Sequence, residues 1–273
     1  MNYIIKGNDI HLSQPDFDLD ETLDCGQAFR WERSADGKYH GAKLNTKLTI
    51  YKEKDYFVLE NTSESDFLDV WCDYFDLDTD YGELKRIYSE DETLAKACKF
   101  ASGIRLLKQD KWEALVSFII SQNNNIPRIK GIIGRLCEEN GGFPSVEQLK
   151  GKTADDLSYL RAGFRAKYLE SCVNLVTSGE ISLERIAAAP VDEARAELMK
   201  IKGVGPKVAD CTMLYGMYKT ECFPVDVWIK RVLAQFYPNG LPEFIKPTAG
   251  IAQQYLFHYI RTSGVYEGRK DKL

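Results

Sequence analysis

A lysine and an aspartate in the C-terminal half of the chain could together carry out chemistry at a sugar carbon. Lys207 follows the tetrapeptide Gly-Val-Gly-Pro at 203–206, and Pro206 suits the first turn of a helix, where its missing N–H costs no hydrogen bond. The positive end of the helix dipole disfavours an ammonium there, which favours the neutral, nucleophilic amine. Asp226 precedes an amphipathic run and is a natural helix N-cap. From two helix starts, the amine could attack a carbon while the carboxylate stabilises the positive charge that develops on it.

The two glycines before the lysine, Gly203 and Gly205, interrupt the helical pattern and predict a tight hairpin between two helices. A helix start leaves several backbone N–H groups unpaired, and glycine allows an anion to approach them closely. Such a hairpin could hold a DNA phosphate without reading the base sequence. Taken alone, the Gly-x-Gly pattern favours a plainer interpretation, a helix–turn–helix corner in which the glycines serve packing.

Helices with regular apolar spacing surround these residues and must position them. Asp110 is expected to cap one helix, which runs into three asparagines at 123–125 and then into a second helix from Ile126. A last amphipathic helix is expected over 248–263, packing back toward the reacting residues.

The N-terminal part of the chain has a different pattern. Residues 1–60 are expected to form strands, with β-forming runs at 39–50 and 56–60. The whole pattern predicts an α+β fold, in which an antiparallel sheet domain with a linking helix (residues 1–100) precedes a helical region (residues 101–273).

The charge of the chain is unevenly distributed. Residues 1–100 have a net charge of −10 and residues 101–273 one of +5, which together make the −5 of the whole chain. An acidic first part and a basic second part favour a nucleic-acid surface placed mostly on the second part.

The cysteine pattern argues against a zinc ribbon, and the hydropathy argues against a membrane span. There is no Cys-x-x-Cys pair, which predicts reduced thiols in a cytoplasmic protein, nucleoid-associated if the source is prokaryotic. No apolar run approaches the length of a membrane helix, and the N-terminus lacks the pattern of a signal peptide. We expect no membrane partner, and we expect the protein to be a monomer. The seven cysteines are Cys25, Cys72, Cys98, Cys137, Cys172, Cys211 and Cys222.

The motif GVGPKVADC at 203–211, followed by FPVDV at 223–227, resembles the helix–hairpin–helix–Gly/Pro–Asp superfamily of DNA glycosylases, and within it the 8-oxoguanine DNA glycosylase branch. Further motifs occur in the order of that branch: GQAFRW at 26–31, NNN at 123–125 and GFRAKY at 163–168. The resemblance implies a bifunctional DNA glycosylase and AP lyase. Its partner would be double-stranded DNA containing oxidised guanine, from which it flips 8-oxoguanine, and ring-opened formamidopyrimidine-guanine, without a metal or organic cofactor.

The resemblance also implies which residues do the chemistry and recognise the base. Lys207 would attack C1′ and form a Schiff base before β-elimination, and Asp226 would stabilise the cationic sugar. Gly26 would accept a hydrogen bond from N7–H of 8-oxoguanine, a donor that guanine lacks, while Gln253 and Phe257 would bond to the flipped base and stack on it. The further base-recognition residues that the resemblance implies are Cys211, Tyr215 and Pro224.

DNA contacts are implied on three segments. Asn123 would enter the base stack where the damaged base has left, Arg128 would contact the orphaned cytosine, and Phe164 would wedge between bases. The remaining DNA-binding residues implied by the resemblance are Arg165, on the opposite strand, and Gly203, Gly205 and Val208 around the hairpin.

Most of these motifs also have a plainer structural interpretation. The stretch around Gly26 could be a strand entering a sheet core, and the three asparagines could form a polar corner. Phe164 and Phe257 could be ordinary core residues. Asp226 could serve only as a helix cap. Two other functions stay open: a glycosylase for another damaged purine, such as an alkylated one, and a non-catalytic helix–hairpin–helix DNA-binding module.

Three departures from related proteins carry expectations of their own. No cysteine follows Cys222, so the C-terminal iron–sulfur cluster of the endonuclease III and adenine-glycosylase branches is missing. Trp228 stands where eukaryotic members carry a phosphate-contacting histidine, and Tyr215 where a methionine packs on the base. One DNA contact and the shape of the base pocket are therefore expected to differ.

Overall fold

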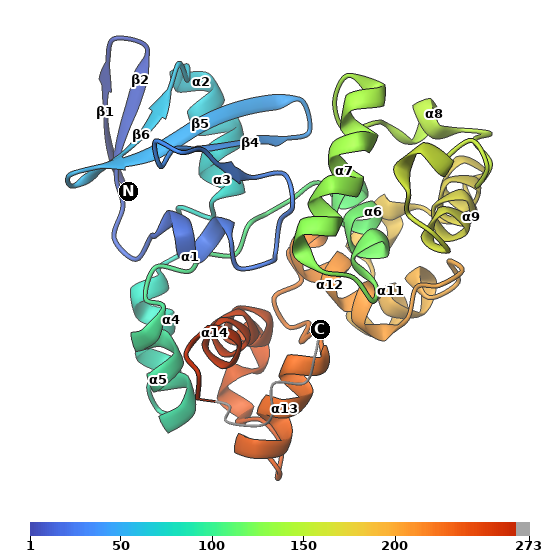
Figure 1. The fold of residues 1–273 in the computed structure, drawn as a ribbon. Helices are drawn as coiled ribbons and strands as arrows, with labels where there is room; N and C mark the ends of the chain where they lie inside the picture. The colour runs from blue at the N-terminus through green and yellow to red at the C-terminus, as the bar shows by residue number, and fades with distance from the viewer. Residues whose placement is uncertain (266–273) are drawn as a thin grey trace.

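The structure is a computed structural model that describes residues 1–265 of the 273. Its N-terminal part is a six-stranded antiparallel sheet in the order β1-β2-β6-β5-β4-β3 (Figure 1). Helices and their connections form most of the remainder, which confirms the predicted α+β fold. The strands are β1 (Asn2–Lys6), β2 (Asp9–Ser13), β3 (Glu32–Arg33), β4 (Tyr39–Lys43), β5 (Thr46–Glu53) and β6 (Tyr56–Glu60).

One face of the sheet is buried under aromatic side chains. Ile10 and Ile50 both pair with Leu59 across neighbouring strands, and all three are fully buried. Trp31 packs edge-on against Trp71 above this face. Trp71 belongs to a short helical stretch, made of α2 (Glu64–Asp66), η1 (Phe67–Trp71) and α3 (Cys72–Tyr74).

The expectation of strands throughout residues 1–60 is wrong at one place. Residues Leu19–Leu23 form helix α1. The helix begins there because the Asp18 side chain accepts a hydrogen bond from the backbone N–H of Glu21 and caps it. The loop that follows α1 leads to Gly26, so this stretch is not a strand entering the sheet.

The β-forming run at 39–50 divides into two strands at a turn that also contacts the helices. Leu44 has a left-handed backbone conformation there (φ 51°), and its N–H donates to the carboxylate of Glu113. Arg30 forms an ion pair with the same carboxylate at 2.8 Å. Burial raises the pKa of Glu113 to about 7, although Arg30 acts in the opposite direction. These long-range contacts fix the sheet against the helical part of the molecule.

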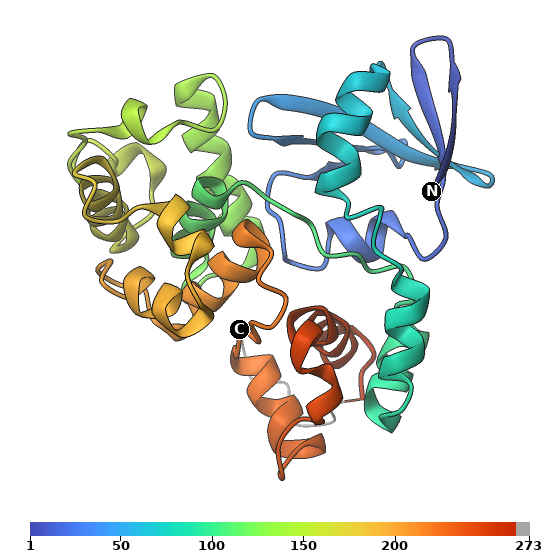
Figure 2. The same ribbon diagram turned by 180° about the vertical axis from the view of Figure 1, so that it is seen from behind.

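The helices form two groups beside the sheet (Figures 1 and 2). One group consists of α4 (Tyr81–Tyr88), α5 (Glu92–Phe100), α13 (Val227–Phe236), η3 (Glu243–Thr248) and α14 (Ala249–Thr262). The other consists of α6 (Lys111–Ser121), α7 (Ile126–Asn140), α8 (Val146–Leu149), η2 (Ser158–Leu160), α9 (Arg165–Thr177), α10 (Leu183–Ala188), α11 (Val191–Leu198) and α12 (Pro206–Met217). Asp110 caps α6, as predicted. Its side chain accepts hydrogen bonds from the backbone N–H groups of Trp112 and Glu113. The predicted domain boundary at residue 100 stays a prediction.

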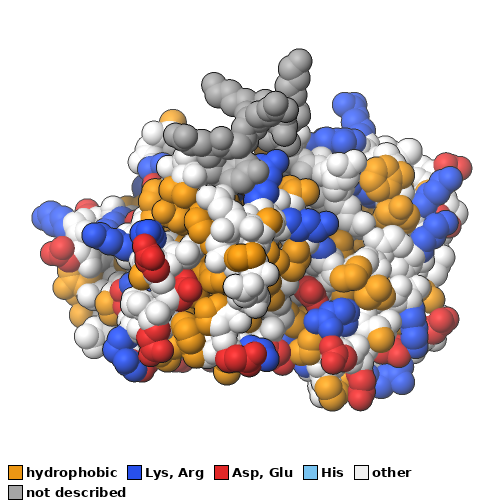
Figure 3. Space-filling model, turned by 90° about the horizontal axis from the view of Figure 1, so that it is seen from below, with side chains coloured by type: hydrophobic (Ala, Val, Ile, Leu, Met, Phe, Trp, Pro, Cys, Tyr) orange, Lys and Arg blue, Asp and Glu red, His pale blue; other side chains and the backbone are white. Residues whose placement is uncertain are grey.

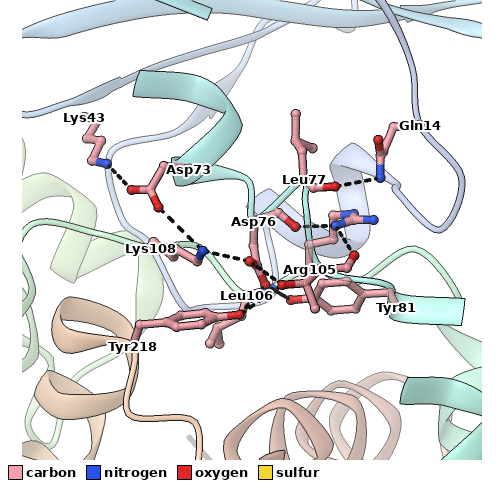
Figure 4. A network of polar contacts seen from close by, with 11 residues as sticks. Gln14, Lys43, Asp73, Asp76, Leu77, Tyr81, Arg105, Leu106, Lys108 and Tyr218 are labelled. Atoms are coloured by element: carbon pink, nitrogen blue, oxygen red, sulfur yellow. Dashed lines mark hydrogen bonds and ion pairs between the residues drawn. The ribbon is translucent and has the colours of Figure 1, made fainter. Parts of the chain in front are cut away.

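A buried carboxylate joins the sheet side of the molecule to the end of α12 (Figure 4). Asp76 Oδ2 accepts hydrogen bonds from the hydroxyls of Tyr81 (2.9 Å) and Tyr218 (2.7 Å), and its Oδ1 pairs with Lys108 Nζ (2.9 Å). The Arg105 guanidinium donates to the backbone carbonyl of Asp76. Because Tyr218 is the C-cap residue of α12, this network holds the C-terminal end of the helix whose first turn carries the predicted nucleophile.

Three further observations concern the surface charge, the cysteines and the apolar character of the helices. Seen from below, Lys and Arg side chains lie among Asp and Glu side chains and hydrophobic ones, so this face has no single sign of charge (Figure 3). All seven cysteines are free thiols. Within residues 1–265, none of the helices has both the length and the apolar character needed to cross a membrane.

Candidate active site

Helix α12 begins at the residues from which a nucleophile was predicted. Gly205 is its N-cap, Pro206 its first residue and Lys207 its second. The chain turns back between α11 and α12, with the N–H of Val204 bonded to the carbonyl of Ile201 at 2.9 Å. The predicted helix–hairpin–helix arrangement is therefore confirmed.

Three of the predicted residues share one face of α12. Lys207, Cys211 and Tyr215 are spaced four residues apart, about one helical turn each. Lys207 Nζ lies 5.1 Å from the centre of the Phe118 ring. That ring stacks on Tyr215, with the ring centres 5.2 Å apart and 17° between the planes. The amine therefore lies beside a pair of stacked aromatic rings, one from α6 and one from α12.

Cys211 lies beside the amine. Burial raises the pKa of this thiol to about 11, and Lys207 acts in the opposite direction through its charge and a side-chain hydrogen bond. Asp226 also acts on the thiol electrostatically, so the predicted nucleophile and the predicted carboxylate are both near it. Asp210 lies next to Cys211 in the same helix. Its carboxylate pairs with Arg195 at 2.7 Å, which holds α11 against α12.

Asp226 is the N-cap of α13, as predicted. Its Oδ1 accepts from the N–H groups of Trp228 (3.0 Å) and Ile229 (2.8 Å). Both bonds use the same oxygen, so within the described residues Oδ2 keeps its lone pairs for another partner. One carboxylate can therefore cap the helix and stabilise a cation at the same time, and the two interpretations of Asp226 do not exclude each other.

Helix α14 presents Gln253 to the site from another side. Gln253 is buried, and its Nε2 donates to the carbonyl of Pro224 at 3.2 Å. Its Oε1 is a buried acceptor that has no hydrogen-bond partner in the described part of the chain. Leaving such an acceptor unpaired costs free energy. An unpaired buried acceptor is therefore expected where a bound ligand supplies the donor.

Gly26 faces α14 from the sheet side. Its backbone is in the left-handed region (φ +88°), and a Cβ built on it would lie 3.9 Å from the Phe257 ring and 3.4 Å from Ile126. The next residue, Gln27, is fully buried and bonds through both ends of its side chain to the backbone of residues 105–107. The loop therefore presents main-chain atoms near the Phe257 ring and is itself held in place. We call Lys207, Cys211, Tyr215, Asp226, Gln253, Phe257 and Gly26 the base site.

The residues predicted to touch DNA form a second group beside the hairpin. Phe164 is 49% exposed at the start of α9, with its ring edge-on to Tyr168. Asn123 is exposed and has a left-handed backbone (φ 46°). Arg128 is exposed in the first turn of α7. An exposed ring and an exposed asparagine are compatible with insertion into a base stack, and the three assignments stay predictions.

Arg165 lies differently from its neighbours. It is only 2% exposed, and its guanidinium donates to the backbone carbonyls of Gln122, Asn123 and Ala162. These bonds brace the asparagine turn against the start of α9. A direct contact with the opposite DNA strand would have to break them, and that predicted contact stays a prediction.

The two hairpin glycines are required for different reasons. Gly203 has φ +85°, and a Cβ on it would come within 2.4 Å of the Tyr168 ring. Gly205 has φ −100°, which any residue can adopt, and a Cβ there would meet nothing within 4 Å. Val208, in the first turn of α12, is buried, and its predicted DNA contact stays a prediction. Packing explains Gly203, whereas the open space in front of Gly205 suits the approach of a phosphate.

This difference predicts opposite outcomes for two alanine variants. Gly203→Ala should lower the free energy of unfolding by about 1–3 kcal/mol, because of backbone strain and the clash with Tyr168. Gly205→Ala should lose only about 1 kcal/mol, the cost of alanine as a poorer N-cap, yet bind DNA more weakly because its methyl group blocks the phosphate. Thermal unfolding and binding titrations with undamaged duplex would measure both effects. Unchanged DNA affinity in Gly205→Ala would mean that no phosphate approaches this backbone.

Some residues of the site gave no usable signal in the sequence. Phe118 has the spacing of a core residue, and nothing local indicates that its ring faces Lys207. Gln254 follows Gln253 directly, and no local pattern tells the two glutamines apart. Gln27 belongs to a motif, but its role in holding the loop depends on a segment about 80 residues away.

Two family models match the chain. The N-terminal domain of 8-oxoguanine DNA glycosylase matches residues 9–115, and the model for HhH-GPD superfamily base excision DNA repair proteins matches residues 116–242. The first covers strands β2 to β6 and the connection to α6, and the second covers the hairpin and the residue at 226.

Similar proteins are found among both characterised sequences and solved structures. The N-glycosylase/DNA lyase of Saccharomyces cerevisiae is 30% identical over 275 residues, covering 85% of this chain and 71% of that protein. An 8-oxoguanine glycosylase/lyase of Clostridium acetobutylicum, solved in complex with dsDNA containing cytosine opposite to 8-oxoG, is 38% identical with a TM-score of 0.88, covering 97% of this chain and 99% of that one. The structure of MBOgg1 in complex with a low affinity DNA ligand is 42% identical with a TM-score of 0.89, covering 96% and 99%.

Proposed function

Because this chain belongs to the 8-oxoguanine DNA glycosylase family of the HhH-GPD superfamily, we propose that its base site removes 8-oxoguanine from duplex DNA. The protein is a DNA N-glycosylase with lyase activity and acts in base excision repair. One observation carries the assignment of this activity to the site: Lys207, beside the Phe118 ring, shares a face of α12 with Cys211, and Asp226 caps α13 through Oδ1 alone.

The proposed reaction begins with extrusion of the damaged nucleotide. Unstacking and unpairing cost a few kcal/mol, offset by Phe164 and Asn123, which fill the space left in the duplex. The N–H groups at Gly205 and the following turn hold a backbone phosphate, helped by the helix dipole.

The chemical steps follow from the two helix starts. The Lys207 amine forms a bond to C1′ as the N-glycosidic bond breaks, and the bonding electrons leave with the base, which takes up a proton. Oδ2 of Asp226 stabilises the positive charge on the sugar meanwhile. Loss of the amine proton and opening of the sugar ring give a Schiff base. Removal of a proton from C2′ then expels the 3′ phosphate by β-elimination.

Recognition is proposed to come from a sandwich and two hydrogen bonds. Phe257 stacks on one face of the base and Cys211 lies against the other. The unpaired Oε1 of Gln253 accepts from the Watson–Crick edge, and the Gly26 carbonyl accepts from N7–H. Guanine presents an acceptor at N7, so two acceptors would face each other and the site would reject it.

Several finer points belong to the proposal. Arg128 near the inserted asparagine supports a preference for cytosine opposite the lesion, and ring-opened formamidopyrimidine-guanine offers a comparable hydrogen-bond donor. We also propose that the protein acts as a monomer, without a cofactor or a membrane partner. Seven free thiols support a reducing, cytoplasmic location, nucleoid-associated if the source is prokaryotic.

Borohydride trapping tests the substrate and the mechanism together. The wild-type protein should form a covalent adduct with a duplex that contains one 8-oxoguanine opposite cytosine, because borohydride reduces the Schiff base. Undamaged, uracil-containing and alkylated-purine duplexes serve as controls. Trapping on the alkylated purine alone would keep the mechanism and change the substrate. Binding without trapping or base release on any duplex would favour the non-catalytic module.

A further inference from the structure

A buried chain of hydrogen bonds connects three sides of the base site. The Tyr215 hydroxyl donates to Gln254 Oε1 at 2.6 Å, and Gln254 Nε2 donates to Cys25 Sγ at 2.9 Å. The Cys25 thiol donates in turn to the carbonyl of Thr22 at 3.3 Å. None of these four residues is more than 4% exposed. The proposed chemistry uses none of these bonds, so they need another explanation.

Each link of this chain is adjacent to a residue of the base site. Tyr215 lies on the same face of α12 as Lys207. Gln254 follows Gln253 on α14, and Cys25 precedes Gly26 in the loop from the sheet side. Adjacent residues share a peptide unit, so a bond that fixes one side chain also restricts the backbone of its neighbour. The chain therefore ties the nucleophile's helix, the base-binding helix and the loop to one another.

The Cys25 thiol and the Tyr215 hydroxyl keep their protons at neutral pH, which preserves these hydrogen bonds. Burial raises the pKa of Cys25 to about 11 and raises that of Tyr215 well above its usual value. Both groups stay protonated at neutral pH and remain donors. Gln254 uses both ends of its amide inside this chain of hydrogen bonds, whereas Oε1 of Gln253 has no partner in the described part of the protein. Of two neighbouring glutamines, one is occupied with the protein and the other is open to a ligand.

We propose that Gln254, together with Tyr215 and Cys25, forms a positioning set that holds the Gly26 carbonyl at the correct place relative to the base bound by Gln253 and Phe257. This inference rests on the proposed function, in which that carbonyl reads N7–H. Hydrogen bonds weaken steeply with distance and angle, so a small shift of the loop weakens recognition of the lesion. The positioning set touches neither the sugar nor the phosphate.

Two reactions of the same protein separate positioning from general damage. Base release from 8-oxoguanine opposite cytosine needs both Gly26 and Lys207. Borohydride trapping on a preformed abasic site opposite cytosine needs Lys207 but has no base to read. Gln254→Leu should slow single-turnover base release about tenfold or more and change abasic-site trapping by about twofold at most.

Cys25 allows both a disruptive and a conservative replacement. Cys25→Ala removes the acceptor for Gln254 and should give the same selective loss as Gln254→Leu. Cys25→Ser keeps an acceptor and a donor, so base release should return close to the wild-type rate. Cys172→Ala, at an equally buried cysteine on α9, opens a similar cavity and should leave the ratio of the two rates unchanged.

The outcomes distinguish this inference from the proposed function. Equal losses in both reactions, or base release at the wild-type rate in Gln254→Leu and Cys25→Ala, would overturn the positioning set. The Cys25 pair decides the matter if Gln254→Leu does not fold. A wild-type protein that traps on abasic sites but releases no 8-oxoguanine would overturn the proposed substrate instead.

Discussion

Replacing Lys207 with glutamine is expected to abolish base release and strand cleavage while DNA binding stays nearly intact. Glutamine keeps a polar side chain at the second position of α12, but its amide nitrogen is not a nucleophile and cannot form a Schiff base. The loss in single-turnover base release should be at least about 10³-fold. Release of 8-oxoguanine, borohydride trapping and a binding titration, all on one duplex, measure the three properties.

A matched control separates the nucleophile from its charge. Lys202 is exposed in the same hairpin, so Lys202→Gln removes one positive charge near the expected phosphate contact and leaves the amine at Lys207. That variant should lose some affinity at low salt and retain the rate at saturating protein. A borohydride adduct with Lys207→Gln would exclude Lys207 as the nucleophile.

The second large effect is expected at Asp226. Asparagine is as good an N-cap as aspartate, so Asp226→Asn should keep the bonds to the two N–H groups of α13 and preserve the fold. It removes the negative charge that stabilises the cationic sugar, which should slow base release by about 10²–10³-fold. Affinity for the damaged duplex should change much less, because the charge on the sugar develops only during the reaction.

The N-cap of α6 provides the control for this substitution. Asp110 accepts from two backbone N–H groups through one oxygen, in the same way as Asp226. Asp110→Asn makes the same chemical change at the same structural position and should leave base release near the wild-type rate. If Asp226→Asn also turns over at the wild-type rate, Asp226 is a cap and nothing more.

Several features of this fold are visible in short stretches of sequence. The caps at Asp110 and Asp226 and the helix start at Pro206 are confirmed because each depends on bonds within three or four residues. The helix at Leu19–Leu23 was missed although it has a cap of the same kind at Asp18. With 5 residues, this helix is too short to show a helical periodicity of apolar residues.

The membership in the family was predicted from the order of motifs, and the family models and similar structures confirm it. A motif states which residue types occur together, but not which way each side chain points. Arg165 belongs to such a motif and proves to be buried among backbone carbonyls. Asp210 lies next to Cys211 and turns to Arg195 on another helix.

The sequence by itself determined the chemistry that is available: an amine and a carboxylate at two helix starts, and a glycine hairpin before the first. The tertiary structure alone decided which side chains meet. Gln254 bonds to Cys25 across 229 residues of sequence, while Oε1 of the neighbouring Gln253 has no hydrogen-bond partner among residues 1–265. That choice depends on how α14 is rotated against α12 and the Gly26 loop. Capping is local and depends on residues that are neighbours in the sequence, whereas the rotation of a packed helix depends on every surface that it contacts.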